Sequence, residues 1–246
     1  MSSIVAKYLL NRYNKFVMEF VSINKLTLLD YPEKVACVLY TQACNFMCPY
    51  CHNWETLIKG EVESINFEEI LSFLKKRQGI LDGVVISGGE PTLMENLPEK
   101  VKKIKELGYL VKLDTNGSNP KMLKKLIDEG LIDYVAMDIK HSPNKYYDII
   151  INKNVDMNDI KESVSILMEN KIDYEFRITL IDEYHDVDSI YEIGKFLEGS
   201  KKLFLQQYKL SDGVRDKELH AVSEEKANKY VDILSQYIDM VELRGY

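Results

Sequence analysis

The chain has 246 residues, of which 46% are hydrophobic and 29% are charged, and its formal net charge at pH 7 is −7. The composition excludes a disordered chain, and the length suffices for one barrel-sized domain with a full core. The acidic balance argues against nucleic-acid binding, and no apolar run approaches the roughly 20 residues of a membrane span. We therefore expect a soluble protein that binds neither nucleic acid nor membrane.

The first 17 residues differ from the rest of the sequence. They contain Lys7, Arg12 and Lys15 and only broken apolar runs, which is not the pattern of a secretory signal peptide. We expect residues 1–17 to be an N-terminal extension, residues 18–246 to form one domain, and the protein to be cytoplasmic. In a reducing compartment, clustered cysteines favour metal ligation or catalysis over disulfides.

From about residue 34, short β-branched runs alternate with segments of helical periodicity, which is typical of a parallel sheet with crossover helices. Strands are predicted at 35–41, 84–86, 110–114, 134–137, 174–180 and 203–207. Helices are predicted at 66–78, 97–107, 120–129, 160–168, 190–197 and 224–237. Six βα units are two short of a closed barrel, so the expected α/β fold is a partial (β/α)6 barrel, an open TIM-like barrel with outer helices.

Polar residues follow the predicted strands at their carboxyl ends, where barrel-like parallel folds bind ligands. The first strand leads into a cysteine-rich loop, and the second into Gly88-Gly89-Glu90. The third ends at Asp114, and the fourth leads into Asp138-Ile139-Lys140. The alternation of the fifth strand places Arg177 on the face opposite to its apolar residues. A barrel lumen with charged residues is what a charged cofactor requires.

Three of the four cysteines, Cys44, Cys48 and Cys51, have the spacing Cys-x3-Cys-x2-Cys. Three thiolates this close together can close over one face of a [4Fe–4S] cluster, which normally takes four cysteines. Cys37 lies inside the first predicted strand, where a cysteine usually acts as a small buried hydrophobe. One iron would then lack a protein ligand and could bind a substrate or cofactor, as catalytic zinc does at its open position.

Other interpretations of the cysteine loop remain open. Cys48-Pro49-Tyr50-Cys51-His52 matches the haem attachment pattern Cys-x-x-Cys-His, although Cys44 is then unexplained. A structural zinc site could use the three cysteines and His52, but the adjacency of His52 to Cys51 would strain a tetrahedral shell. The cysteines could also be buried without any ligand.

The cysteine motif after the first strand, with Gly88-Gly89-Glu90 after the second, resembles that of radical S-adenosylmethionine (SAM) enzymes. Within these, the stretch from Leu29 to Asn53 is similar to the glycyl-radical-enzyme activating enzymes, above all those of anaerobic ribonucleotide reductase and pyruvate formate-lyase. Ala43 departs from this pattern, in which we expect a glycine. The resemblance extends over nearly all of the chain from Met18 onward.

This resemblance implies a ligand and a role for each motif. Cys44, Cys48 and Cys51 would ligate three irons of a [4Fe–4S] cluster, and the amino and carboxylate groups of SAM would chelate the fourth. The residues assigned to cofactor binding are Tyr50, Cys51, His52, Gly88, Gly89, Glu90, Asp114, Asp138, Lys140, Arg177 and Gln206. Lys140 and the three cysteines would form the catalytic set.

Among these residues, Tyr50 would lie against the adenine, and the Gly88-Gly89 backbone would meet the amino end of SAM. Lys140 would contact the SAM carboxylate, and the aspartates would orient the ribose hydroxyls or hold a monovalent cation. Each motif also has a purely structural interpretation: a core aromatic, turn glycines, polar residues at strand ends, or an ordinary buried ion pair for Arg177. We expect the remaining histidines to lie at the surface: His141, His185 and His220.

The resemblance also implies partners. A flavodoxin or ferredoxin would reduce the cluster, and SAM would be cleaved to methionine and a 5′-deoxyadenosyl radical. That radical would take a hydrogen atom from a backbone glycine of a glycyl-radical enzyme. Two competing functions remain: a radical SAM enzyme acting on a small molecule, similar to the 7-carboxy-7-deazaguanine synthases, and a non-catalytic iron–sulfur protein that transfers electrons. The former tend to have Asp-Thr after the last cysteine, where this chain has His52-Asn53.

Overall fold

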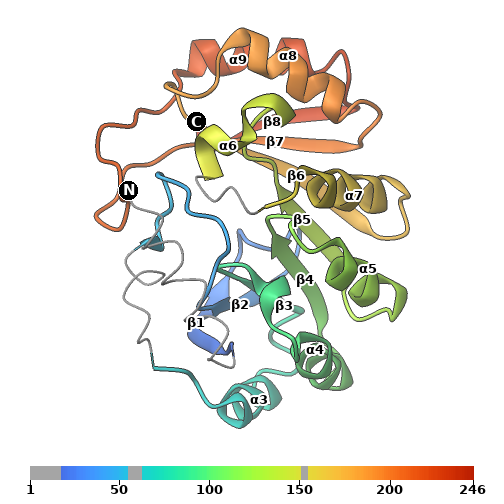
Figure 1. Cartoon of the computed structure of the whole chain (residues 1–246). Helices are drawn as coiled ribbons and strands as arrows, with labels where there is room; N and C mark the ends of the chain where they lie inside the picture. The colour runs from blue at the N-terminus through green and yellow to red at the C-terminus, as the bar shows by residue number, and fades with distance from the viewer. Residues whose placement is uncertain (1–17, 55–62, 151–154) are drawn as a thin grey trace. The chain divides into compact units, whose positions relative to one another are not determined.

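The computed structural model of the chain describes residues 18–54, 63–150 and 155–246 (Figure 1). Eight strands are ordered β1 to β8 along one sheet, with β1 and β8 at its two ends. Strand β1 is antiparallel to β2, whereas β2 to β4 and β6 to β8 are parallel. This mostly parallel, unclosed sheet with helices confirms the expected open TIM-like barrel.

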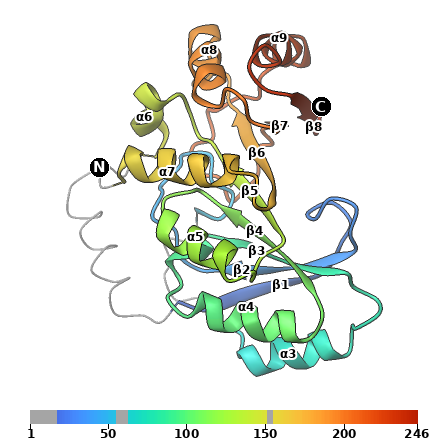
Figure 2. The same cartoon turned by 90° about the vertical axis from the view of Figure 1, so that its right-hand side faces the viewer.

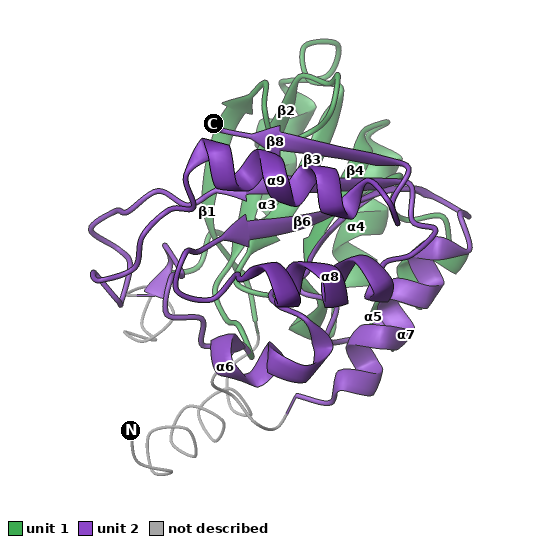
Figure 3. Ribbon diagram, turned by 90° about the horizontal axis from the view of Figure 1, so that it is seen from above, with its two compact units in different colours: residues 1–45, 55–115, 121–134 green, residues 46–54, 116–120, 135–246 purple. Residues whose placement is uncertain are grey.

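The chain divides into two compact units (Figure 3). Unit 1 takes in the described residues of 1–45, 55–115 and 121–134, and unit 2 those of 46–54, 116–120 and 135–246. The cysteine loop is therefore shared, because Cys44 belongs to unit 1 whereas Cys48 and Cys51 belong to unit 2. The expected extension at residues 1–17 lies outside the described residues.

Unit 1 contains strands β1 to β4 with the helices that follow them along the chain (Figure 2). Its elements are β1 (Phe20–Thr27), β2 (Ala36–Thr41), α3 (Phe67–Lys75), β3 (Gly83–Gly88), the 3-10 helix η1 (Pro91–Leu93), α4 (Leu97–Glu106), β4 (Leu110–Thr115) and nearly all of α5 (Pro120–Asp128). The side chain of Asn66 caps α3 by accepting a hydrogen bond from Glu68 N–H. A buried hydrophobic cluster of this unit consists of Tyr31, Ala36, Val38, Val85 and Tyr134.

Unit 2 contains nearly all of β5 and the C-terminal half of the chain. Its elements are β5 (Tyr134–Asp138), the 3-10 helix η2 (Pro143–Lys145), α6 (Tyr146–Ile150), α7 (Met157–Met168), β6 (Asp173–Leu180), α8 (Val187–Phe196), β7 (Lys202–Gln207), α9 (Glu224–Leu234) and β8 (Met240–Arg244). Helix α8 begins with a capping box between Asp186 and Ser189 and packs beside α9 (Figures 1 and 3).

All six predicted strands are present within a few residues of their expected bounds, as β2 to β7. The expected number of strands was too low, because the sequence pattern did not indicate β1 or β8. Strand β1 is an edge strand with several exposed positions, and β8 is five residues long and half-exposed, so neither has a continuous apolar run. Helix α6 was missed because five residues are too few for helical periodicity. Within the described residues, no helix is long and apolar enough to cross a membrane.

Candidate functional site

In unit 1, the turn after β3 lies directly against the chain that leads into the cysteine loop. A Cβ atom at Gly88, where φ is +115°, would lie 2.3 Å from the Thr41 nitrogen, and one at Gly89 would lie 1.9 Å from the Ala43 oxygen. The N–H of Gly89 donates to the Thr41 carbonyl at 3.0 Å, and that of Glu90 donates to the Ala43 carbonyl at 2.6 Å. Only glycines allow this approach, so the turn fixes the backbone immediately before Cys44.

The side chain of Glu90 is fully buried and bonded to the protein. Its Oε1 accepts hydrogen bonds from the Thr92 N–H at 3.1 Å, from the Thr92 hydroxyl, and from the Thr115 hydroxyl at 2.7 Å. The carboxylate thereby ties the turn after β3 to the end of β4. The assignments of Gly88, Gly89 and Glu90 to cofactor binding stay predictions.

Asp114, at the end of β4, forms an ion pair with Lys112 on the same face of the strand. Lys112 is 1% exposed, although it lies in the middle of a strand. Burial, followed by the charges of Asp30 and Asp114, raises the pKa of Tyr40. Lys112 is a charged residue of this region that the sequence analysis missed; its place two residues before Asp114 was the available signal.

In unit 2, the motif Asp138-Ile139-Lys140 forms a three-residue charge cluster with Arg177. Lys140 Nζ lies 3.0 Å from one Asp138 oxygen, and Arg177 Nε lies 2.8 Å from the other. Burial alone would raise the pKa of the Asp138 carboxyl, but the Arg177 and Lys140 cations lower it to about 2. Burial disfavours the charged form of Lys140, yet Asp138 and other nearby groups raise its pKa well above its ordinary value. All three groups are therefore charged at neutral pH.

Two residues of the cysteine loop lie beside this charge cluster. Lys140 Nζ is 6.0 Å from the centre of the Tyr50 ring, and burial is the main cause that raises the pKa of the Cys48 thiol to about 12. The Tyr50 hydroxyl is buried and has no hydrogen-bond partner within the described part of the chain. Without a metal the Cys48 thiol is protonated, so metal binding would have to release its proton. A buried hydroxyl without a hydrogen-bond partner and a buried thiol, both near the Lys140 ammonium, are features of a ligand site.

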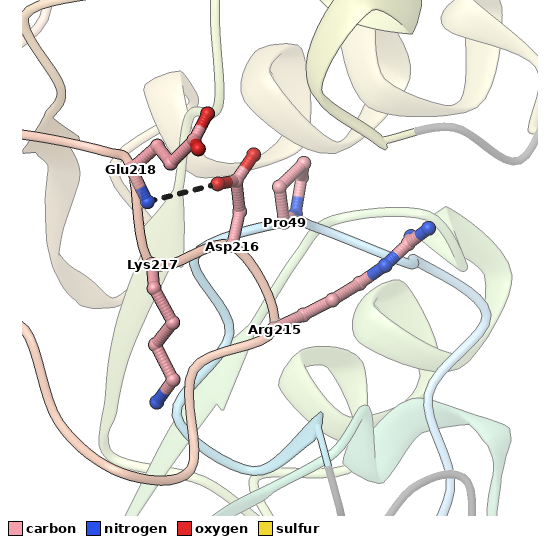
Figure 4. Close-up of a pocket in the computed structure, with 5 residues that line it drawn as sticks. All are labelled: Pro49, Arg215, Asp216, Lys217 and Glu218. Carbon is pink, nitrogen blue, oxygen red and sulfur yellow. Dashed lines mark hydrogen bonds between the residues drawn. The ribbon is translucent and has the colours of Figure 1, made fainter.

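The rest of the loop is held by backbone contacts within unit 2. Met47 N–H donates to the Ile150 carbonyl, and Asp216 N–H donates to the Pro49 carbonyl, both at 3.1 Å. A Cβ at Gly213 would lie 2.3 Å from the His52 oxygen, so the segment after β7 packs tightly on the loop. Together with Pro49 of the loop, this segment lines a pocket of about 460 Å³, to which it contributes Arg215, Asp216, Lys217 and Glu218. Figure 4 shows the Asp216 carboxylate accepting a hydrogen bond from the Glu218 N–H.

Unit 2 thus brings together Cys48, Tyr50, Asp138, Lys140 and Arg177, but it places two other predicted residues elsewhere. The His52 ring lies against Tyr208, with the ring centres 6.3 Å apart. Gln206, near the end of β7, is opposite Thr179 of β6 and Arg244 of β8. The roles of both residues toward a cofactor stay predictions.

The assignment of Cys44, Cys48 and Cys51 as ligands of an iron–sulfur cluster stays a prediction. Among the residues that the structure describes, no three His, Cys, Asp or Glu side chains are grouped to hold one metal ion. Cluster thiolates bind different irons and so need not converge on one point, whereas zinc ligands must. Cys37 is fully buried in β2, where burial raises the pKa of its thiol to about 12, as suits a small hydrophobe.

Two of the three histidines expected at the surface are buried. His141 is 1% exposed and His185 is fully buried, with their rings stacked at 5.3 Å, whereas the His220 side chain is 76% exposed as expected. His185 Nδ1 accepts from the Ile181 N–H at 3.0 Å, and its Nε2 lies 3.3 Å from the Lys140 carbonyl. Each of the two has a charged neighbour in the sequence, Lys140 before His141 and Asp186 after His185, and so resembles a surface position. Their burial depends on tertiary contacts that the sequence does not indicate.

We expect His185 to make the protein less stable in mild acid. Burial, followed by the charge of His141, lowers the pKa of His185 from 6.5 to about 4. Below pH 6.5 the unfolded chain binds a proton that the folded chain does not, so stability is lost as the pH falls from 6.5 toward 4. The loss would amount to about 3 kcal/mol. Urea unfolding across this range should show a steep pH dependence that His185→Gln flattens; an equal slope in both proteins would contradict the assignment.

The comparisons with known proteins agree with this geometry. Residues 38–196 match the family model of the radical SAM superfamily, which spans the cysteine loop, the glycine turn and the charge cluster. The chain belongs to the radical SAM superfamily. The expected family is thereby confirmed, and this family implies a [4Fe–4S] cluster and SAM as cofactors.

Similar radical SAM proteins cover most of this chain. A protein named as a glycyl-radical enzyme activating enzyme in Methanocaldococcus jannaschii is 33% identical over 89% of this chain and 92% of its own length. The pyruvate formate-lyase-activating enzyme of Clostridium pasteurianum is 27% identical over 89% of this chain and 97% of its own. Among solved structures, a domain of the pyruvate formate-lyase-activating enzyme of Bacteroides vulgatus has a TM-score of 0.52 and 21% identity, covering 66% of this chain and 99% of that domain. That last likeness supports the fold.

Proposed function

We propose that this radical SAM protein is an activating enzyme that cleaves SAM reductively and generates a glycyl radical on a partner enzyme. The observation that carries the proposal is the relative named as a glycyl-radical enzyme activating enzyme, which is 33% identical over nearly the whole of both chains. The Clostridium pasteurianum relative supports the same activity at comparable coverage. A flavodoxin or ferredoxin is the proposed electron donor, and the glycyl-radical enzyme is of the anaerobic ribonucleotide reductase or pyruvate formate-lyase type.

The proposal assigns the cluster ligands to Cys44, Cys48 and Cys51, which leaves one iron for SAM. When bound, the cluster supplies the electron for cleavage of SAM, and SAM supplies the radical that abstracts hydrogen. The chain itself keeps water away from this chemistry, because Cys48 and Tyr50 are each only 6% exposed. The glycine turn holds the backbone before Cys44 by two hydrogen bonds, which positions the first ligand.

The charge cluster is suited to the methionine end of SAM. Lys140 carries a fixed positive charge beside Cys48 and the Tyr50 ring, where a carboxylate could pair with it. Asp138 keeps the ammonium in place, and Arg177 keeps Asp138 ionised. The orphaned Tyr50 hydroxyl supports a ligand contact at this point, and we assign its ring to the adenine. Asp114 is proposed to orient the ribose, and a monovalent cation remains a further prediction.

The test is electron paramagnetic resonance on the anaerobically reconstituted, reduced protein, with and without SAM. We expect a [4Fe–4S]⁺ signal whose shape changes when SAM binds the open iron. A signal that ignores SAM would point to electron transfer, and bound zinc without a cluster would overturn the proposal. Adding a candidate glycyl-radical enzyme should then produce a glycyl radical signal on that partner. Turnover of a small molecule in place of this signal would favour the synthase alternative.

A further inference from the structure

The backbone of Lys140 is held from both sides by buried side chains of unit 2. Its N–H donates to the Tyr146 hydroxyl oxygen at 3.2 Å, and its carbonyl lies 3.3 Å from Nε2 of His185. Tyr146 and His185 are both fully buried, so water does not compete for these bonds. The preceding N–H, that of Ile139, donates to the Arg177 carbonyl of β6 at 2.8 Å. The loop after β5 is therefore fixed at each of its peptide groups near the lysine.

The contacts of His185 favour a neutral ring with its hydrogen on Nε2. Nδ1 lies 3.0 Å from the Ile181 nitrogen and 3.1 Å from the Ile181 carbonyl oxygen, and Nε2 lies 3.3 Å from the Lys140 carbonyl oxygen. We assign the hydrogen to Nε2, because Nδ1 can then accept the Ile181 N–H while Nε2 donates to the Lys140 carbonyl. The Ile181 carbonyl already accepts the backbone N–H of His185 at 2.9 Å. The ring stacks on that of His141, and the Tyr230 hydroxyl donates to the His185 carbonyl at 2.5 Å, so the ring and the main chain of His185 are each held by a further contact.

These main-chain contacts matter because a lysine side chain is flexible, with four rotatable bonds. A fixed backbone narrows the range of positions that its ammonium group can occupy. Asp138, itself paired with Arg177, bonds the charged end of Lys140, whereas Tyr146 and His185 bond its main chain. We propose that Tyr146 and His185 are positioning residues that hold the Lys140 ammonium where the SAM carboxylate binds. This inference rests on the proposed function, in which Lys140 contacts SAM.

The first test is Tyr146→Phe, which removes the acceptor of the Lys140 N–H and keeps the ring. We expect the dissociation constant of SAM, measured by equilibrium binding to the cluster-loaded protein, to rise about 2- to 10-fold. Tyr109→Phe is the matched control, because the Tyr109 hydroxyl is also buried and also bonds the main chain, in this case by donating to the Leu74 carbonyl at 2.7 Å. The control should bind SAM as the unchanged protein does.

The second test uses His185. His185→Leu removes the donor to the Lys140 carbonyl and should weaken SAM binding, whereas His185→Gln keeps an N–H at that place and should restore most of the affinity. If His185 only stabilised the fold, the SAM affinity would not depend on whether the substituted side chain can donate a hydrogen bond to the Lys140 carbonyl. His185→Leu and Tyr146→Phe are independent, so the failure of one variant to fold leaves the other as a test.

Lys140→Met separates this inference from the proposed function. If Lys140 contacts SAM, this change alone should weaken binding by at least about tenfold, as for a hydrogen bond to a charged group. Tyr146→Phe should then add no further loss in the Lys140→Met background. An equal loss in both backgrounds, or no loss from Tyr146→Phe beside a clear loss from Lys140→Met, would overturn the positioning role. No loss from Lys140→Met would instead refute the role of Lys140 in the proposed function.

Discussion

Cys48→Ala is expected to abolish both cluster binding and SAM cleavage while the chain stays folded. A [4Fe–4S] cluster held by three thiolates has one iron open, and loss of Cys48 would leave two irons without a protein ligand. The fold should persist, because the loop around Cys48 is also held by backbone hydrogen bonds from Met47 and to Pro49. The measurements are iron content, visible absorption after reconstitution, and the yield of 5′-deoxyadenosine.

Cys37→Ala is the matched control for this experiment. Cys37 and Cys48 are both buried cysteines whose thiol pKa values are raised to about 12, but Cys37 lies within β2 and outside the motif. Its variant should lose some stability, about 1 kcal/mol, and keep the cluster and its reaction with SAM. Retained cleavage in Cys48→Ala, or loss of the cluster in Cys37→Ala, would refute the ligand assignment.

Gly89→Ala is expected to destabilise unit 1 by about 3 kcal/mol, at the upper end for overpacking. The added Cβ would lie 1.9 Å from the Ala43 carbonyl oxygen and 2.4 Å from its carbon. Both are backbone atoms, so no side-chain rotation relieves the clash and the segment before Cys44 must move. We therefore also expect a marked loss of SAM affinity. Chemical denaturation followed by circular dichroism measures the first effect, and equilibrium binding measures the second.

Gly130→Ala controls for the removal of a glycine as such. Gly130 has a φ of +63° and nothing within 4 Å of an added Cβ, so the substitution carries only backbone strain of about 1–2 kcal/mol. It follows α5, and it should leave SAM binding unchanged. If Gly89→Ala proved no more harmful than Gly130→Ala, the turn after β3 would not be packed on the cysteine loop as described.

The parts of the fold with local signals could be predicted from the sequence. Strand β3 and the glycines that end it were recognisable from a buried apolar run followed by Gly88-Gly89, and the cysteine loop from its spacing. Strand β8 has no such run. It packs partly through Arg244, which pairs with Glu175 of β6 and lies over the Phe204 ring of β7, 3.7 Å from the ring centre. These contacts join residues far apart in the chain, so the local sequence pattern did not indicate the strand.

The same distinction holds within the candidate site. Asp138 ends β5 and Lys140 follows two residues later, so their closeness is local in the sequence. His185 is 45 residues from Lys140, and its neutral, fully buried state depends on hydrogen bonds to Ile181 and Lys140. A single sequence does not indicate which distant backbone groups will satisfy a histidine. The Thr115 partner of Glu90, which is 25 residues away in the chain, was hidden for the same reason.

The ion pair between Lys112 and Asp114 also constrains how this protein could evolve. Lys112 is 1% exposed in the middle of β4, and Asp114 is the carboxylate it pairs with. Replacing Asp114 alone would strand a buried ammonium, which typically costs about 3–5 kcal/mol, a large part of the stability of a domain. A lineage that changes the residue at 114 must therefore first, or simultaneously, replace the lysine. The buried Lys112 thus constrains the residue at position 114, which is proposed to contact the cofactor, even if Lys112 itself does not contact it.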